Sequence, residues 1–236
     1  MDLYAYLCGG RKRNMFQLLQ VILPDGGPVY AETDTSHIVA EPFNAISAAL
    51  FIIIAVYWLW RATVKEGTKN SFFIPSLIIL LIGGVGGTIY HAFRAHSFFL
   101  YMDWVPILIL CVIACVYFLK LLNVSWKRIG TGIITIFAFQ YLNFNFVPPH
   151  IAVNLSYAIL GLTVLTPLVL YMRKTQYRYA KEPILALVSF ALALSFRISD
   201  KMVDLPMGTH FLWHTFGAFT AFFLLQYMYR LPLEEN

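Results

Sequence analysis

The chain has 236 residues, of which 59% are apolar, 17% aromatic and only 12% charged, and its net charge is +5. Soluble domains usually carry about 25% charged residues, so this composition excludes a disordered protein, a coiled coil and a nucleic-acid-binding protein. The positive charges lie in short gaps between apolar runs, as they do in the loops of membrane proteins. The sequence therefore predicts an all-α membrane protein.

Residues 1–37 precede the first long apolar run and are predicted to form an extracytoplasmic segment. Within it, three basic residues at 11–13 are followed by a short apolar stretch at 15–23, which two glutamines interrupt. This pattern is typical of an amphipathic segment that lies on a membrane surface, rather than of a cleaved signal peptide.

Residues 38–230 are predicted to form one domain of seven transmembrane helices, followed by a cytoplasmic tail at 231–236. A membrane-spanning helix needs roughly 20 mostly apolar residues. The stretch 129–172 contains no Asp, Glu, Lys or Arg and is too long for one helix, so the polar and proline residues near its middle divide it into two spans. The other spans are expected at about 39–60, 72–93, 98–119, 183–198 and 209–229.

The distribution of Lys and Arg predicts the orientation of the bundle. Eleven of these residues fall on one side of the predicted spans and six on the other. Because cytoplasmic loops are enriched in Lys and Arg, the N-terminus is expected outside the cytoplasm and the C-terminus inside it. We therefore expect an integral multi-pass membrane protein, located in the inner membrane of a bacterium or in the ER or Golgi membrane of a eukaryote.

Five ionisable residues lie within the predicted spans, where charged and polar groups are costly and mark functional sites. Glu41, Asp103, His210 and His214 lie at the starts of their spans, and His91 lies at the end of its span. In an up-and-down bundle, all five positions fall at the same face of the membrane. We therefore expect one polar site there.

The histidines of this group have the spacing of a metal site. His210 and His214 are four residues apart, so both imidazoles lie on one face of a helix, and His91 would complete a shell of three. Three histidines with an open fourth position form a common catalytic zinc site, in which a water molecule ionises near neutral pH. Two alternatives are interfacial histidines with ordinary hydrogen bonds and a pair of haem ligands.

The remaining polar and aromatic residues suggest simpler roles. The other histidines are expected in loops, and the charged residues before the last span are expected to form a solvated, mutually paired loop, with Arg197 alternatively orienting a substrate head group. Cys111 and Cys115 are expected to be small packing residues, and the tryptophans an interfacial belt. The other histidines are His37, His96 and His150, and the charged residues before the last span are Arg197, Asp200, Lys201 and Asp204.

The order of these motifs resembles the alkaline ceramidases, a branch of a seven-span superfamily that also contains adiponectin receptors and lipid hydrolases that remodel GPI anchors. The resemblance covers residues 30–230. It is carried by Glu41-Pro-Phe-Asn44-Ala-Ile-Ser47, Tyr90-His91, Tyr101-Met-Asp103 and His210-xxx-His214 before Gly217.

The resemblance implies a zinc ion held by His91, His210 and His214, with Asp103 beside the zinc water as the catalytic residue. It also implies hydrolysis of an amide bond in a lipid such as ceramide, which would enter the bundle sideways from the bilayer. Glu41 could also act as the base, but it is three residues before Asn44 on the same helix face. A structural role for this pair, tying the N-terminal segment to the bundle or to calcium, is therefore expected.

The chain departs from the family pattern at two places. The family usually has a serine four residues before the second-span histidine, where this chain has Gly87, so that Thr88 or Ser47 would have to replace it. Some ceramidases bind calcium through an acidic N-terminal stretch and the glutamate that matches Glu41. The carboxylates of Asp25, Glu32 and Asp34 suit calcium, but their spacing differs from that pattern.

Two other classes of protein remain open at this point. The first is a seven-span lipid receptor or scaffold with a structural zinc, which the missing serine favours. The second is a haem-binding membrane protein. A retinal protein is excluded because the last predicted span, 209–229, contains no lysine for a Schiff base.

Overall fold

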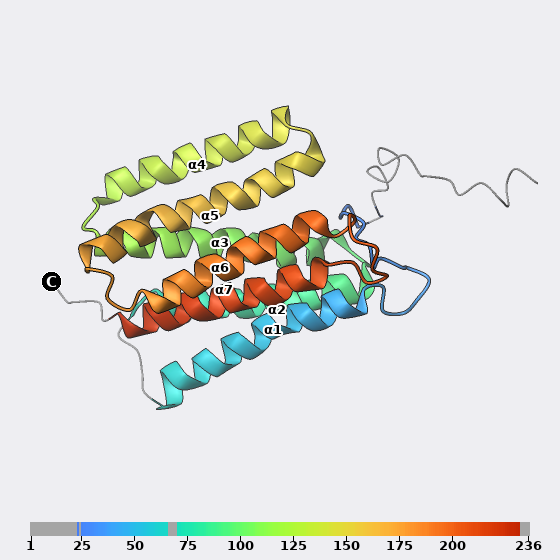
Figure 1. The fold of residues 1–236 in the computed structure, drawn as a ribbon, viewed down its shortest axis with the longest axis horizontal. Coiled ribbons are helices and arrows are strands. Elements are labelled where there is room, and N and C mark those ends of the chain that lie inside the picture. Colours follow the sequence, from blue (N-terminus) through green and yellow to red (C-terminus); the bar gives the residue numbers. More distant parts are fainter. Residues whose placement is uncertain (1–22, 24, 66–69, 232–236) are drawn as a thin grey trace, which may run out of the picture.

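The computed structural model describes residues 23, 25–65 and 70–231, and within these ranges it is all-helical (Figure 1). The predicted amphipathic stretch lies outside the described residues, apart from Leu23. A short π-helical turn, Arg61–Lys65, extends the first helix. The long helices are α1 (Pro42–Trp60), α2 (Phe73–Phe93), α3 (Ser97–Leu121), α4 (Trp126–Phe146), α5 (Pro149–Lys174), α6 (Lys181–Ser199) and α7 (His210–Arg230).

The helix boundaries follow the sequence signals closely. Pro42 and Pro149 occupy the first turns of α1 and α5, where the missing backbone N–H costs nothing. The uncharged stretch is divided after Phe146, as expected, and Asn143 Nδ2 donates to the carbonyl of Ala152 at 2.7 Å across the turn. Within the described residues, the expected limits of the helices are therefore confirmed to within a few residues.

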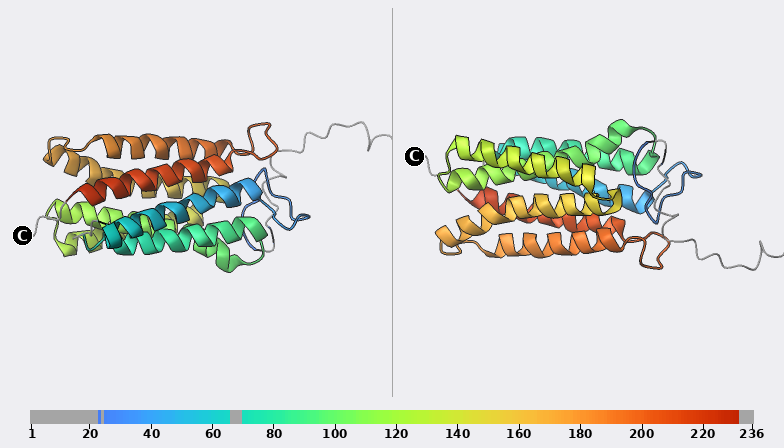
Figure 2. Two further views of the ribbon diagram at one scale, coloured as in Figure 1. Left: turned by 90° about the horizontal axis from the view of Figure 1, so that it is seen from below. Right: turned by 90° about the horizontal axis from the view of Figure 1, so that it is seen from above.

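Six of the helices close a ring, and the seventh lies outside it. Around the ring, α1 packs on α2, α2 on α3, α3 on α5, α5 on α6, α6 on α7 and α7 on α1. Helix α4 packs mainly on α5, outside the ring, and Figures 1 and 2 show it at the edge of the bundle. Its three buried residues are Ile129, Gln140 and Asn143.

Glycines in α2 let its neighbours approach closely. A Cβ atom added to Gly84 would lie 2.9 Å from the backbone nitrogen of Ile52 in α1, and one added to Gly86 would lie 2.8 Å from the backbone carbon of Met102 in α3. Small residues serve this purpose in membrane helices, where close backbone contact replaces the hydrophobic effect. The glycines on two sides of α2 thus let α1 and α3 pack closely around it.

The two ends of the bundle differ in what they bury. The apolar core lies around the end of α1, the beginning of α2 and the end of α7, and includes Trp58, Phe73, Leu77 and Met228. At the other end the buried residues are largely polar. Figure 1 shows the described N-terminal segment, in blue, at that polar end, together with the connection between α6 and α7.

Among the described residues, five helical segments are long and apolar enough to cross a membrane, namely Pro42–Lys65, Phe73–Phe93, Ser97–Leu121, Ile151–Lys174 and Lys181–Ser199. Large apolar side chains face outward along the bundle, such as Ile46 at 73% and Ile134 at 71% exposure. Such a surface is unfavourable in water but suits contact with lipid. The structure thus supports the prediction from composition that the protein is embedded in a membrane.

Candidate metal centre

Three buried histidines meet at the polar end of the bundle. His91 comes from the last turn of α2, and His210 and His214 come from the first two turns of α7. One ligand atom of each residue lies within 4.8 Å of the others, and the ring centroids are 4.7 to 5.4 Å apart. These three form the one group of three or more His, Cys, Asp or Glu side chains in the described part of the chain that could hold a metal ion.

Two of the imidazoles have their outer nitrogen fixed by the protein. His91 Nδ1 lies 2.5 Å from Glu41 Oε2, and His214 Nδ1 lies 3.1 Å from both Ser47 Oγ and the carbonyl oxygen of Asn44. These contacts direct the Nε2 atom of each ring away from its anchor. A metal-bound histidine usually has its other nitrogen held in this way by a carboxylate or a carbonyl.

Two ring nitrogens of this group lack a protein partner. Among the described residues, the buried His91 Nε2 and His210 Nδ1 have no hydrogen-bond partner. A buried polar atom without a partner costs free energy, and a metal ion coordinated by the three rings removes that cost. The residues present therefore fit a metal ion, and their chemistry, three neutral nitrogen donors, suits zinc among several transition metals.

A buried ion-pair network anchors Glu41. Arg94 donates through Nε and Nη2 to Asp25 at 2.7 and 3.1 Å and through Nη1 to Glu41. Thr33 Oγ1 donates to Glu41 Oε1 at 2.6 Å, and Asn44 Nδ2 donates to Glu41 Oε2 at 3.2 Å. Glu41 thus connects the N-terminal segment to the bundle.

The charges of this network stabilise one another. Burial by itself raises the pKa of Glu41, but the hydrogen bond and charge of His91, the charge of Arg94 and the bond from Thr33 hold this pKa below its usual value. Burial likewise lowers the pKa of Arg94, and the ion pairs with Asp25 and Glu41 outweigh it, so that the pKa is raised. The network therefore favours the charged forms of both groups.

The roles of Asp25 and Arg94 were not predicted from the sequence. Arg94 is three residues after His91, so the two side chains would lie on nearly the same helix face. That spacing is the signal that could have indicated it. Asp25 lies 69 residues away from Arg94 in the chain, and no local pattern indicates the pairing.

The expectation of a solvated charged loop before α7 was wrong in part. Asp200 is buried, and its carboxylate accepts from the backbone nitrogens of Thr209 and His210, both at 2.8 Å, and of Ala31 at 2.9 Å. It thereby satisfies free N–H groups at the start of α7 and fixes the backbone of one of the three histidines. Lys201 is exposed, as expected.

Arg197 lies inside the polar end rather than in solvent. Its guanidinium carbon is 4.6 Å from the ring centroid of Tyr157 and 5.3 Å from that of Trp213. Such stacking lets a cation lie in an apolar environment. The belt interpretation of the tryptophans was also incomplete, because Trp58 and Trp213 are buried.

Asp103 lies beside the turn of α2 that precedes His91. A Cβ atom added to Gly87 would lie only 2.5 Å from Asp103 Oδ1. Because a helical side chain covers the turn before its own Cα, the ring of His91 and the carboxylate of Asp103 occupy neighbouring space. Gly87, where the family pattern has serine, therefore leaves room for this carboxylate.

The two residues considered as substitutes for the serine have other partners. Thr88 Oγ1 donates to the carbonyl of Gly84 at 2.7 Å, which is a bond within its own helix. The hydroxyl of Ser47 lies against His214 Nδ1 and also donates to the carbonyl of Asn44 at 3.0 Å. Ser47 thus contacts the outer nitrogen of a histidine rather than the centre of the group.

The two remaining described carboxylates of the N-terminal segment do not converge on one point. Glu32 accepts from the backbone nitrogens of Phe43 and Asn44 at 2.5 and 3.0 Å and caps α1, while the exposed Asp34 bonds to Ser36. Calcium binding stays a prediction, and a calcium ion at Glu41 would have to displace Arg94. His37 and His96 are exposed, and Cys111 and Cys115 are free thiols.

A scan against models of known protein families and a search of curated proteins found no match to the chain. The resemblance to the alkaline ceramidases therefore rests on the residues named above. In the part of the chain that the structure describes, the fold is all-helical, with five helices that could cross a membrane and a buried group of three histidines that could bind a metal ion.

Proposed function

We propose that this protein is an integral membrane hydrolase that binds zinc through His91, His210 and His214 and cleaves an amide bond in a lipid such as ceramide. One observation carries the proposal. Three buried imidazoles converge, two of them with their outer nitrogens already held by protein groups, and a carboxylate lies beside the turn before His91. This is the arrangement that metal-assisted hydrolysis needs.

The proposed membrane topology has seven spans. Helices α4 and α7 are not among the five segments named above, but each has 21 residues. A helix of that length extends over roughly 30 Å, the thickness of the hydrocarbon core. Both run beside helices that could cross a membrane (Figure 2). The excess of Lys and Arg at the end remote from the histidines supports a cytoplasmic location of that end.

In the proposed reaction, the carbonyl carbon of the amide gains an oxygen from water, its bond to nitrogen breaks, and the products are a fatty acid and an amine. Zinc bound by the histidines supplies a Lewis acid that polarises the carbonyl and lowers the pKa of water. The carboxylate of Asp103 accepts the water proton and passes it to the leaving nitrogen. Glu41 and Ser47 keep the imidazoles in place, and the apolar bundle admits the acyl chain from the lipid.

The first test measures metal content and needs no substrate. Purified wild-type protein is expected to contain about one zinc ion per chain by elemental analysis, and His210→Ala is expected to contain much less. His37→Ala is the matched control, because His37 is an exposed histidine at the same end of the bundle, and it should keep its zinc. Active preparations without any bound metal would refute the proposal.

The second test measures turnover. Wild-type protein should release fatty acid from ceramide, and Asp103→Asn should lose about 10²–10⁴-fold of that activity while it keeps its zinc. Asp204→Asn, at an exposed carboxylate, is the control and should behave like wild type. Full activity of Asp103→Asn would show that another group is the base.

A second candidate function is a receptor or scaffold with a structural zinc ion, and the observation that favours it is Gly87 in place of a serine. It predicts bound zinc with no product released from ceramides. A haem protein is the third alternative, and a Soret band in the purified protein would indicate it. Three converging imidazoles, rather than two, favour the zinc interpretation over haem.

A further inference from the structure

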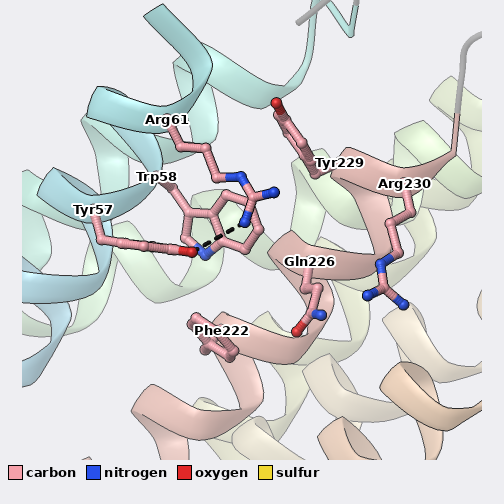
Figure 3. Close-up of a pocket in the computed structure, with 7 residues that line it drawn as sticks. All are labelled: Tyr57, Trp58, Arg61, Phe222, Gln226, Tyr229 and Arg230. Carbon is pink, nitrogen blue, oxygen red and sulfur yellow. Dashed lines mark hydrogen bonds between the residues drawn. The ribbon is translucent and has the colours of Figure 1, made fainter. Parts of the chain in front are cut away.

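A cavity lies at the end of the bundle remote from the histidines. Its volume is about 270 Å³, and it lies between the end of α1, the π-helical turn and the end of α7 (Figure 3). Because the histidines lie in the first two turns of α7 and the cavity is lined by residues of its last turns, the two sites are roughly 20 Å apart along this helix. Its lining residues are Tyr57, Trp58, Arg61, Phe222, Gln226, Tyr229 and Arg230.

Two arginines give this cavity a positive charge. The guanidinium carbon of Arg61 lies 5.5 Å from the ring centroids of both Trp58 and Tyr229, and its Nη1 donates to Tyr57 Oη at 3.1 Å. Arg230 is held by an ion pair of its Nη1 with Glu182, which leaves its other donors available, because a guanidinium has five. None of the seven lining residues is acidic.

The cavity also contains a buried donor without an acceptor. Trp58 is only 2% exposed, and its Nε1 has no hydrogen-bond partner among the described residues. Figure 3 shows this nitrogen on the same side as the Arg61 guanidinium and the Tyr57 hydroxyl. An indole nitrogen can only donate, and burying it without an acceptor costs free energy. A ligand with oxygen acceptors would remove this cost.

We propose that this cavity binds a phosphate group, carried either by an anionic lipid head group or by a small soluble phosphate. Phosphate offers several acceptor oxygens with negative charge, which match the fork of an arginine better than a single neutral acceptor does. The cavity lies at the end of two helices, at the depth of lipid head groups in the proposed topology. Basic pockets between transmembrane helices on the cytoplasmic side bind such head groups.

In the bound state, Arg61 and Arg230 donate to the phosphate oxygens from two helices. Trp58 Nε1 and the amide of Gln226 provide further donors from the walls. The ligand thereby links the end of α1 to the end of α7, and it does so independently of the metal centre. This site does not depend on the proposed hydrolase activity.

The test uses the full chain purified in a neutral detergent and two probes. Native mass spectrometry measures the binding of phosphatidylglycerol, with phosphatidylcholine as the uncharged comparison, and a thermal shift measures the binding of inorganic phosphate. Wild type should bind the anionic lipid about tenfold more tightly than the neutral one. Competition by inorganic phosphate would show that phosphate alone is recognised, whereas binding of the lipid only would show that its glycerol or acyl part is also needed.

Three variants separate the site from general surface charge. Arg61→Gln should weaken phosphatidylglycerol binding about tenfold, as expected for the loss of a charge-assisted hydrogen bond. Trp58→Phe keeps an aromatic ring but removes the indole N–H, and should weaken phosphatidylglycerol binding about threefold. Arg128→Gln removes one exposed cation from the same end of the bundle and should leave binding within about twofold of wild type.

The outcomes distinguish the proposal from its alternatives. Equal binding of phosphatidylglycerol by wild type, Trp58→Phe and Arg61→Gln would overturn it. The same losses in Arg128→Gln as in Arg61→Gln would also overturn it, because they would show unspecific attraction between charges. The zinc content of all three variants should equal that of wild type, so that failure of this proposal can be told apart from failure of the hydrolase proposal.

Discussion

Gly87→Ala tests the relation between α2 and Asp103 most directly. The added Cβ atom would lie 2.5 Å from Asp103 Oδ1, whereas ordinary van der Waals contact begins at about 3.4 Å. The carboxylate must therefore move by about 0.9 Å. Because this atom is the end of a side chain, the rotation of one side chain relieves the clash and the helices need not separate.

The displacement should affect catalysis far more than folding. Misplacement of a reacting group by about 1 Å can cost roughly 10²-fold in rate. We therefore expect Gly87→Ala to lose about 10²-fold in ceramide turnover, with a zinc content and a melting temperature close to those of wild type. Gly87→Ser should lose less than the alanine variant, because its hydroxyl can donate a hydrogen bond to the displaced carboxylate.

A control variant and two further measurements show whether a loss of turnover comes from Asp103. Gly130→Ala is the matched control, since a Cβ atom there meets nothing within 4 Å, and it should leave turnover unchanged. Turnover, zinc content and melting temperature are measured on the same preparations. Unchanged turnover in Gly87→Ala would refute the placement of Asp103 as the base, and a loss of zinc would show that Gly87 positions His91 instead.

Further predictions concern stability and metal binding. Gly86→Ala should lower the melting temperature rather than the intrinsic rate, because its Cβ would meet the backbone of Met102; an unchanged melting temperature would contradict the close approach of α2 and α3. Asp25→Ala leaves Arg94 without one buried partner, which typically costs about 3–5 kcal/mol, and a thermal melt should show clear destabilisation. Glu41→Gln should lower thermal stability but retain some ceramide turnover, and complete loss of turnover with intact zinc would instead make Glu41 a candidate base. A chelator should lower the melting temperature of wild type and added zinc should restore it, because a ligand of the native state stabilises it by roughly 2.7 kcal/mol at a hundredfold excess over its dissociation constant; His210→Ala should show no such response.

The sequence determined the helices and the depth of the candidate site. Long apolar runs fix the lengths of membrane helices because each backbone polar group must be satisfied within the lipid, so the limits of the helices could be predicted to within a few residues. The spacing of His210 and His214 fixes their common face. The positions of His91 and Asp103 near the ends of consecutive helices indicate that both lie at the same end of the bundle.

The tertiary structure alone decided how that end is held together. Asp25 pairs with Arg94, and Asp200 accepts from Ala31, across 69 and 169 residues of chain. Such pairs depend on how the N-terminal segment folds back over the helices, and no local spacing encodes that path. The same holds for Trp58, whose position near a helix end indicated a lipid interface, whereas packing of α7 against α1 buries it. Periodicity describes which face of a helix is apolar, but only the assembled bundle determines which polar groups are shielded from water and must therefore find partners.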